Sequence, residues 1–249
     1  MAIRFELRAE THPSQECPAC SLDAACHLRF LMKAFVYSLA LTVVGLFSPP
    51  LLAAEYPDTT GWKDLFSPDL SNSAAPGKWL MADGVLVAKN HETLWTNDSY
   101  ANFILDLEFK VDKESNSGVF LRSSNTSNVL AALEIQVHES TDGTGHGMVG
   151  AIYDACKPSK SMAKPLGEWN HFTITCKDSL VSVIFNGEEV IHADLNDWKE
   201  AHKNPDGTPN KFGTALKDYA RKGPIGLQGL HGKAQAPVYY RNLKIKVLE

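Results

Sequence analysis

Three polar residues that could act together in a reaction alternate along one short run of the chain: Glu134, Gln136 and His138. Successive side chains of a β-strand point to opposite faces, so a strand here would present a carboxylate, an amide and an imidazole on one face. Such a patch can supply a general acid or base. The same spacing also fits a strand with a solvated outer face, because charged residues are mostly exposed. The residues alone leave both interpretations open.

A neighbouring run, residues 118–123, could bring a cation to the same patch. If Val119 and Leu121 point into a core, alternation places Phe120 and Arg122 on the opposite face. We therefore expect the Arg122 guanidinium to lie on the face that carries the polar patch.

Other polar rings occur where strand-like runs end. Tyr153 ends such a run and His231 follows one, and each could equally be an ordinary loop side chain. Trp169 could pack at a strand entry or offer a stacking surface for a sugar ring. The histidines after residue 54 do not have the spacing of a strong metal site.

Period-two alternation dominates the chain from Gly61 onward and defines the elements that must position these residues. The clearest case is the run 103–111, in which apolar residues alternate with charged ones. Similar runs occur at residues 118–123, 133–138, 172–176, 180–185 and 238–247. Asn186–Gly187 between two of them is a strong hairpin signal. A polar insert at residues 196–223, with a helical turn expected near residues 215–220, is either a binding loop or disordered.

No stretch sustains a helical apolar period beyond about two turns, and no glycine-rich nucleotide fingerprint is present. The pattern therefore predicts an all-β fold, with two antiparallel sheets packed as a jelly-roll β-sandwich.

The N-terminal part predicts export. Met32 and Lys33 precede an apolar run at residues 34–47 and a small-residue exit at residues 51–54, which is the layout of a secretory signal. A buried helix or an uncleaved anchor is the alternative. We expect residues 1–31 to be an upstream extension, 32–54 a signal peptide and 55–249 a single domain, periplasmic or secreted and without a membrane span after cleavage.

The formal net charge of −5 gives no electrostatic footprint for nucleic acid or an anionic membrane. Export would permit a disulfide between Cys156 and Cys176. Cys176 also alternates with apolar residues, so an inert core thiol is an equal alternative.

Seven short motifs, in order along residues 61–249, make the chain resemble the 3-keto-disaccharide hydrolase domain family. They are Gly61-Trp62-x-x-Leu65-Phe66, Asn116-Ser117-Gly118-Val119-Phe120-Leu121-Arg122, Glu134-Ile135-Gln136-Val137, Gly150-Ala151-Ile152-Tyr153, Gly167-Glu168-Trp169-Asn170, Gly223-Pro224-Ile225-Gly226-Leu227-Gln228 and Arg241-Asn242-Leu243-Lys244-Ile245. The chain departs from the family pattern at His138 and at Gly229-Leu230-His231-Gly232, which has one residue more than usual.

The resemblance implies a concanavalin A-like jelly roll and cleavage of glycosides already oxidised to a ketone at C3. A 3-keto group acidifies the C2 proton, so that the glycosidic oxygen can leave by elimination before water adds. We expect Glu134 or His138 to be the base or acid and Arg122 to stabilise the enolate. A divalent ion could replace the guanidinium. Sugar hydroxyls would be oriented by Gln136, Tyr153, Gln228 and His231.

Two other classes fit the same fold: a non-catalytic carbohydrate-binding module and a conventional glycosidase. A binding module would need an aromatic platform and would tolerate Glu134→Gln. A conventional glycosidase would need two facing carboxylates about 5 to 9.5 Å apart, but Glu134 has no carboxylate partner on its own strand.

Overall fold

The computed structural model describes residues 56–249 except 75, 89 and 140–144. The expected extension at 1–31 and signal peptide at 32–54 lie outside the described residues. Within the described part, the strands are β1 (Lys63–Asp64), β2 (Ser73–Ala74), β3 (Trp79–Ala82), β4 (Val85–Ala88), β5 (Leu94–Thr96), β6 (Phe103–Lys110), β7 (Asn116–Leu121), β8 (Leu133–His138), β9 (Trp169–Lys177), β10 (Leu180–Phe185), β11 (Glu188–Asp194), β12 (Gly226–Leu227) and β13 (Tyr239–Val247). Short 3₁₀ helices lie at Pro76–Lys78, Val129–Ala131, Gly145–Gly147, Leu195–Asp197 and Leu216–Asp218.

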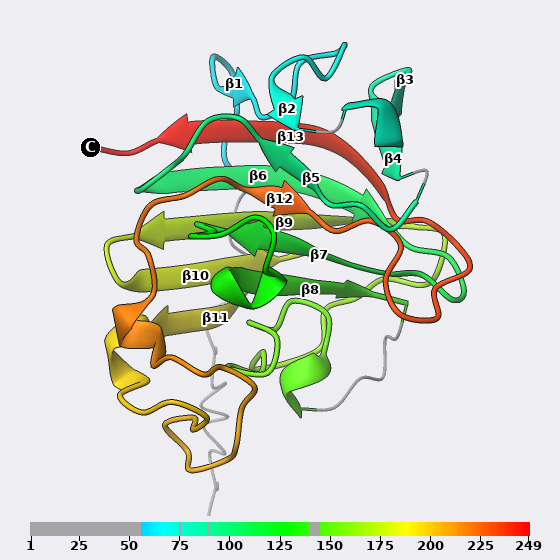
Figure 1. Ribbon diagram of the computed structural model, residues 1–249. Helices are drawn as coiled ribbons and strands as arrows, with labels where there is room; N and C mark the ends of the chain where they lie inside the picture. Colours follow the sequence, from blue (N-terminus) through cyan, green and yellow to red (C-terminus); the bar gives the residue numbers. More distant parts are fainter. Residues whose placement is uncertain (1–55, 75, 89, 140–144) are drawn as a thin grey trace, which may run out of the picture. The chain divides into compact units, whose positions relative to one another are not determined.

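The strands form two antiparallel sheets, which confirms the prediction of an all-β sandwich (Figure 1). The larger, eight-stranded sheet has the order β11-β10-β9-β6-β13-β4-β3, and β1 also pairs with β13. The five-stranded sheet has the order β2-β5-β12-β7-β8. Neighbouring strands are therefore often far apart in sequence, and β12 brings the chain after residue 223 between β5 and β7.

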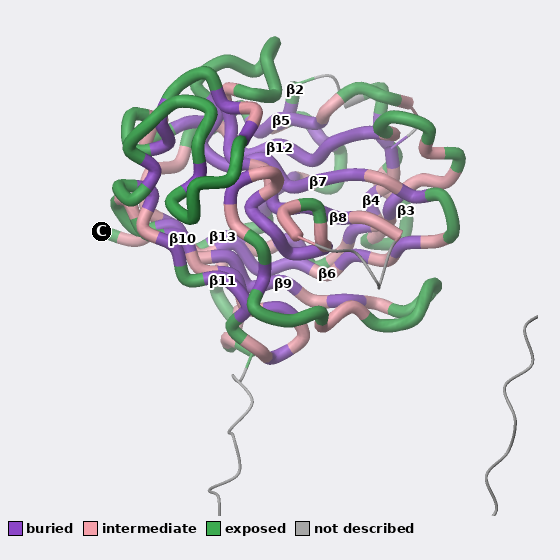
Figure 2. Tube along the Cα trace, turned by 90° about the horizontal axis from the view of Figure 1, so that it is seen from below, coloured by how far each residue is buried: buried purple, intermediate pink, exposed green. Residues whose placement is uncertain are grey.

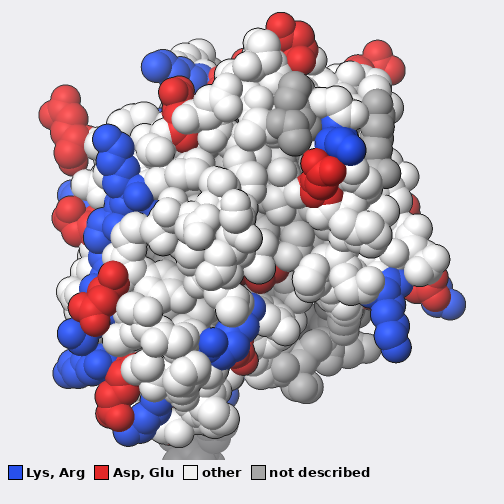
Figure 3. Space-filling view, in the orientation of Figure 1, with Lys and Arg blue, Asp and Glu red and all other residues white. Residues whose placement is uncertain are grey.

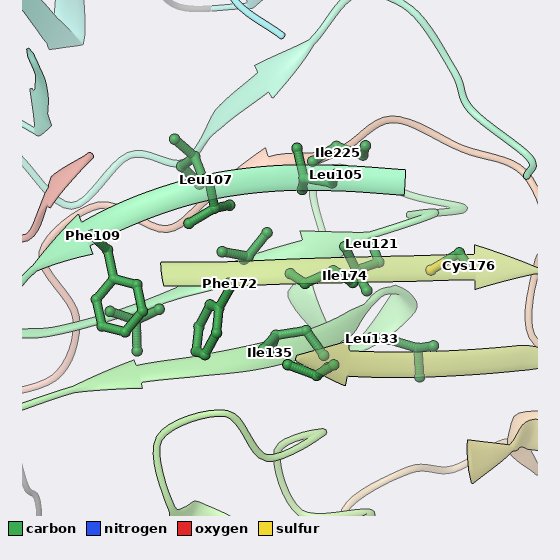
Figure 4. Packing of buried hydrophobic residues seen from close by; sticks show 14 of the residues in the cluster. Leu105, Leu107, Phe109, Leu121, Leu133, Ile135, Phe172, Ile174, Cys176 and Ile225 are labelled. Carbon is green, nitrogen blue, oxygen red and sulfur yellow. The ribbon is translucent and has the colours of Figure 1, made fainter. Parts of the chain in front are cut away.

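Alternation builds the core between the sheets. In β6, Phe103, Leu105 and Leu107 are fully buried, and Val119 of β7 and Ile135 of β8 join the same cluster from the other sheet. Figure 4 shows such side chains between the strands, and Figure 2 shows buried positions following the strands while exposed ones follow the loops. Burial of one face leaves the other face of each sheet free for polar groups.

The predicted hairpin is confirmed between β10 and β11. Asn186 and Gly187 have positive φ angles of 48° and 86°, and Phe185 pairs directly with Glu188. Two consecutive positive φ angles are the requirement of a type I′ turn, whose twist matches that of the strands.

The two described cysteines are free thiols. Cys176 lies in the core, where burial raises the pKa of its thiol to about 12. Of the two possibilities left by the sequence, the structure therefore selects an inert core thiol for Cys176. Over the described ranges, no helix has both the length and the apolar character needed to cross a bilayer.

The polar insert at residues 196–223 is ordered by its own contacts. The Trp198 indole donates to Asn204 Oδ1 at 2.9 Å, and the Asn210 side-chain amide donates to the same oxygen at 2.8 Å. The expected helical turn is present as Leu216–Asp218. Phe212 is buried in the core cluster, so the residue before it is held against the body of the sandwich.

Candidate active site

Glu134 lies on the outer face of the five-stranded sheet, as the alternation predicts. Its Cα partner across β7 is Phe120, which pairs in turn with Gly226, and Gly226 pairs with Trp95 of β5. The rings of Trp95 and Phe120 stack at 5.4 Å between centroids, and they are only 6% and 0% exposed. Glu134 is therefore the backbone partner of Phe120, one member of a buried aromatic pair.

Glycines on this face make room for the two large side chains. A Cβ at position 118 would lie 2.8 Å from Glu134 Cγ, so the carboxylate side chain folds across the strand at Gly118. A Cβ at position 226 would lie 2.7 Å from Trp95 Cζ3. A side chain at either glycine would displace its neighbour, since real Cβ contacts are essentially never shorter than 3.0 Å.

Lys211 supplies the cation of the site, and it comes from the long insert. Its Nζ lies 3.9 Å from Glu134 Oε2 and 3.9 Å from the centroid of the Tyr153 ring. Its backbone amide donates to Asp154 Oδ2 at 2.6 Å. Sequence reasoning missed Lys211, because a lysine in an irregular segment has no periodic partner, and the only signal was that the insert could be a binding loop.

Burial sets the electrostatics of this pair. The Glu134 side chain is 12% exposed and that of Lys211 is 30% exposed. Desolvation raises the pKa of Glu134 to about 7 against the opposing effect of Lys211, and burial also lowers the pKa of Lys211. No group in the described part of the chain donates a hydrogen bond to the Glu134 carboxylate. A carboxyl of this kind can exchange a proton near neutral pH.

The structure brings most of the predicted site residues to this face. The Tyr153 amide donates to Glu134 O at 2.8 Å, and the Gln228 amide donates to Gly118 O at 2.9 Å. Gln136 pairs with Gly118 and is buried.

His138 and His231 lie at the end of this face that is far from Glu134. His138 pairs with Asn116, four residues beyond Glu134 and hence roughly 13 Å away along the strand. The His231 amide donates to Asn116 O at 3.3 Å. Burial and the nearby charge of Lys211 lower the pKa of His231.

Arg122 is an exception, and the expectation that it shares the face of Glu134 is wrong. Strand β7 ends at Leu121, and Arg122 has a positive φ of 51°, so pleat alternation does not extend to it. Its side chain turns toward β6, where the guanidinium lies 5.9 Å from the Phe103 ring and donates to Ala101 O and Asp178 O at 2.7 Å. Arg122 is 2% exposed, holds two loops together through these hydrogen bonds and lines neither of the two cavities described below.

Two cavities adjoin the site. One, of about 450 Å³, is lined by residues that include Asn116, His138, Glu139, His231, Lys233 and Gln235. The other, of about 650 Å³, is lined by residues that include Ser124, Leu130, Ala131, Lys211, Thr214 and Tyr219. Figure 3 shows acidic atoms recessed near the middle of this view, with a basic side chain beside them. Within the described residues, no three His, Cys, Asp or Glu side chains converge as metal ligands.

A recessed carboxyl with a raised pKa beside a lysine makes this face of the β-sandwich the candidate active site. Residues 57–246 match the 3-keto-alpha-glucoside-1,2-lyase-like domain, and the chain belongs to this family. The match covers every strand of the sandwich except the last residue of β13, and it confirms the resemblance drawn from the short motifs.

Similar proteins agree with the assignment to this family. The chain is 25% identical over 211 residues to a 3-keto-disaccharide hydrolase of Bacteroides thetaiotaomicron, covering 70% of this chain and 71% of the relative. A crystal structure of a candidate glycosyl hydrolase from Parabacteroides distasonis is 37% identical, with a TM-score of 0.71, covering 75% of this chain and 99% of the other. A second candidate glycosyl hydrolase from that organism is 25% identical, with a TM-score of 0.59 and coverages of 75% and 84%.

Proposed function

We propose that this protein cleaves 3-keto-glycosides, 3-keto-disaccharides among them, by elimination followed by hydration, with Glu134 as the base. The observation that carries the proposal is the state of Glu134. Its carboxyl is recessed, receives no hydrogen bond from the described residues, has a pKa raised to about 7 by burial and lies 3.9 Å from Lys211. A base poised near the working pH is what proton abstraction beside a carbonyl requires.

The first step removes the proton from C2 of the oxidised ring. Glu134 takes this proton, and the electron pair of the C–H bond forms the C2–C3 double bond of an enolate whose charge rests on O3. The pair then returns as the carbonyl re-forms, a C1–C2 double bond appears and the C1–O bond breaks with protonation of the leaving oxygen. Water adds to C1 and a proton to C2, so the net reaction is hydrolysis.

Lys211 takes the role expected of Arg122. Its ammonium is close enough to Glu134 to face a ring whose C2 touches the carboxylate, and a cation there stabilises the enolate oxygen. The Arg122 guanidinium instead donates hydrogen bonds to two backbone carbonyls. A divalent ion bound with the substrate would supply the same stabilisation, so a chelator distinguishes the two sources of charge.

The remaining residues take supporting roles. Tyr153, whose ring centroid lies 3.9 Å from the Lys211 ammonium, is the candidate to protonate the leaving oxygen, and Gln136, Gln228 and His231 are the candidates to hold hydroxyls. His138 lies roughly 13 Å along the strand from Glu134, so it is not placed to act on the same carbon as the base.

A non-catalytic carbohydrate-binding module and a conventional glycosidase are less well supported than this enzyme. A binding module would present an open aromatic platform, whereas Trp95 and Phe120 are buried. A conventional glycosidase would pair Glu134 with a second carboxylate, whereas the side chain that contacts it is Lys211. We also propose, from the layout of residues 32–54, that the protein is exported to the periplasm or secreted.

The test is incubation of the purified protein with 3-keto-trehalose, 3-keto-lactose and the parent sugars, with and without a chelator, while released sugar is measured. Release from the keto sugars alone supports the proposal, and loss of release on chelation assigns the stabilising charge to a metal. Cleavage of the parent sugars would instead indicate a conventional glycosidase. Binding without any turnover would indicate a carbohydrate-binding module.

A further inference from the structure

The 450 Å³ cavity, called the Asn116 cleft below, lies at the end of the small sheet away from Glu134. Asn116 begins β7 and faces His138, the last residue of β8. His231 closes the other side through the hydrogen bond from its amide to Asn116 O. The cleft is thus built by three segments that the sheet brings together.

Two buried side-chain oxygens in the described part of the chain have no hydrogen-bond partner, Asn116 Oδ1 and Gln228 Oε1. An unpaired buried polar atom costs about 1–3 kcal/mol, and native proteins keep few of them. Both atoms belong to the candidate active-site face. Their most direct explanation is a partner that arrives with the ligand.

The positions of the two amides connect Glu134 to the Asn116 cleft. Gln228 is hydrogen-bonded to Gly118, the residue over which the Glu134 side chain folds. Asn116, two residues before Gly118, is the neighbouring outward-facing residue of β7 on the side away from Glu134. A polar strip therefore runs from the base past Gln228 to Asn116, over roughly 13 Å of strand.

We infer that the Asn116 cleft binds the leaving sugar ring, and that Asn116, which lines the cleft, and Gln228, which lies beside Gly118 between the cleft and Glu134, hydrogen-bond to its hydroxyls. This rests on the proposed function, which places the oxidised ring at Glu134 and Lys211. A sugar hydroxyl both donates and accepts, so it completes a side-chain amide in either orientation of its oxygen and nitrogen. The preferred substrates are therefore disaccharides or longer, not glycosides of a small alcohol.

The test compares 3-keto-trehalose with the methyl glycoside of 3-keto-glucose, using wild type and Asn116→Leu. Leucine has nearly the shape of asparagine without its amide. We expect kcat/KM for the disaccharide to fall about tenfold through KM, as for the loss of a neutral hydrogen bond. The methyl glycoside should be turned over by both proteins with the same kcat/KM. Asn196→Leu, at an exposed position outside the cleft, is the matched control.

Equal losses on both substrates, or no loss on either, would overturn the subsite. The thermal midpoint checks the fold: because Asn116 Oδ1 has no hydrogen-bond partner among the described residues, Asn116→Leu should not lower Tm.

If wild type turns over no keto-glycoside, the proposed function fails, and equilibrium titration with trehalose and glucose then judges the cleft separately. Tighter binding of the disaccharide, weakened about tenfold by Asn116→Leu, would keep the cleft as a sugar site. Equal binding of both sugars, or none, would reject it.

Discussion

Carboxylates on the two outer faces of the sandwich differ in the hydrogen bonds that they receive. On the large sheet, Asp106 accepts hydrogen bonds from His171 at 2.8 Å and Thr173 at 2.6 Å. Next to it, Glu108 accepts two from Arg241, at 2.9 and 3.0 Å. On the small sheet, Glu134 accepts none from the described residues and has a single cation at 3.9 Å.

The pKa shifts follow this difference in partners. Burial tends to raise the pKa of Glu108, but hydrogen bonds from Arg241 and Asn242 outweigh it and hold the pKa below its usual value. For Glu134, burial is opposed only by Lys211, and the pKa rises to about 7. A carboxylate saturated by its neighbours holds a fold together, whereas one left without donors is available to a ligand.

The largest expected effect is on kcat, which should depend on the carboxylate of the small sheet and not on that of the large sheet. Glu134→Gln should lower kcat on a 3-keto-disaccharide by about 10³-fold, since general-base catalysis contributes roughly 10²–10⁴-fold. The matched change on the other face, Glu108→Gln, should leave kcat within about twofold while lowering stability by about 1 kcal/mol, as expected for a partly exposed ion pair. Steady-state kinetics on both variants decides. Comparable losses of kcat would remove the distinction between the faces.

The second effect is on stability and has opposite signs on the two faces. The pKa of Glu134 is raised from about 4.3 in the unfolded chain to about 7, so wild type loses stability as pH rises through this window. Glu134→Gln should therefore be more stable than wild type by about 3 kcal/mol at pH 8, with no difference near pH 4.

The lowered pKa of Glu108 gives the reverse dependence. Its stabilisation is present above the unfolded pKa and is lost as pH falls through the folded pKa, so Glu108→Gln should be destabilised at pH 8 and should match wild type in acid. Urea unfolding at several pH values measures both variants. A Glu134→Gln protein that is less stable than wild type at pH 8 would contradict the burial argument.

The smallest effect tests the cation. Lys211→Met should lower kcat about 10²-fold, the usual size for loss of one group that stabilises an oxyanion. It should also move the acid limb of the kcat/KM profile to higher pH, because Lys211 lowers the pKa of Glu134. Lys217→Met, an exposed lysine paired with Asp218, is the control and should change neither. An unshifted acid limb would mean that Glu134 does not carry the titrating proton.

The sequence by itself determined the features that depend on near neighbours in the chain. Period-two alternation located β8 and β10 with their observed ends, and Asn186–Gly187 located the hairpin. The same alternation placed Glu134 on a shared face with Gln136, because a strand fixes the direction of every second side chain.

Only the tertiary structure decided which residues meet Glu134 and how it ionises. Lys211 reaches the carboxylate from an irregular insert, so no local pattern could pair the two. Arg122 does not lie on this face, because its own positive φ, directly after the end of β7, interrupts the alternation. The pKa of Glu134 depends on its burial in the assembled sandwich and on Lys211, which comes from a distant segment. Contacts between distant segments and the exclusion of water arise when the sheets assemble, whereas strand period is set residue by residue.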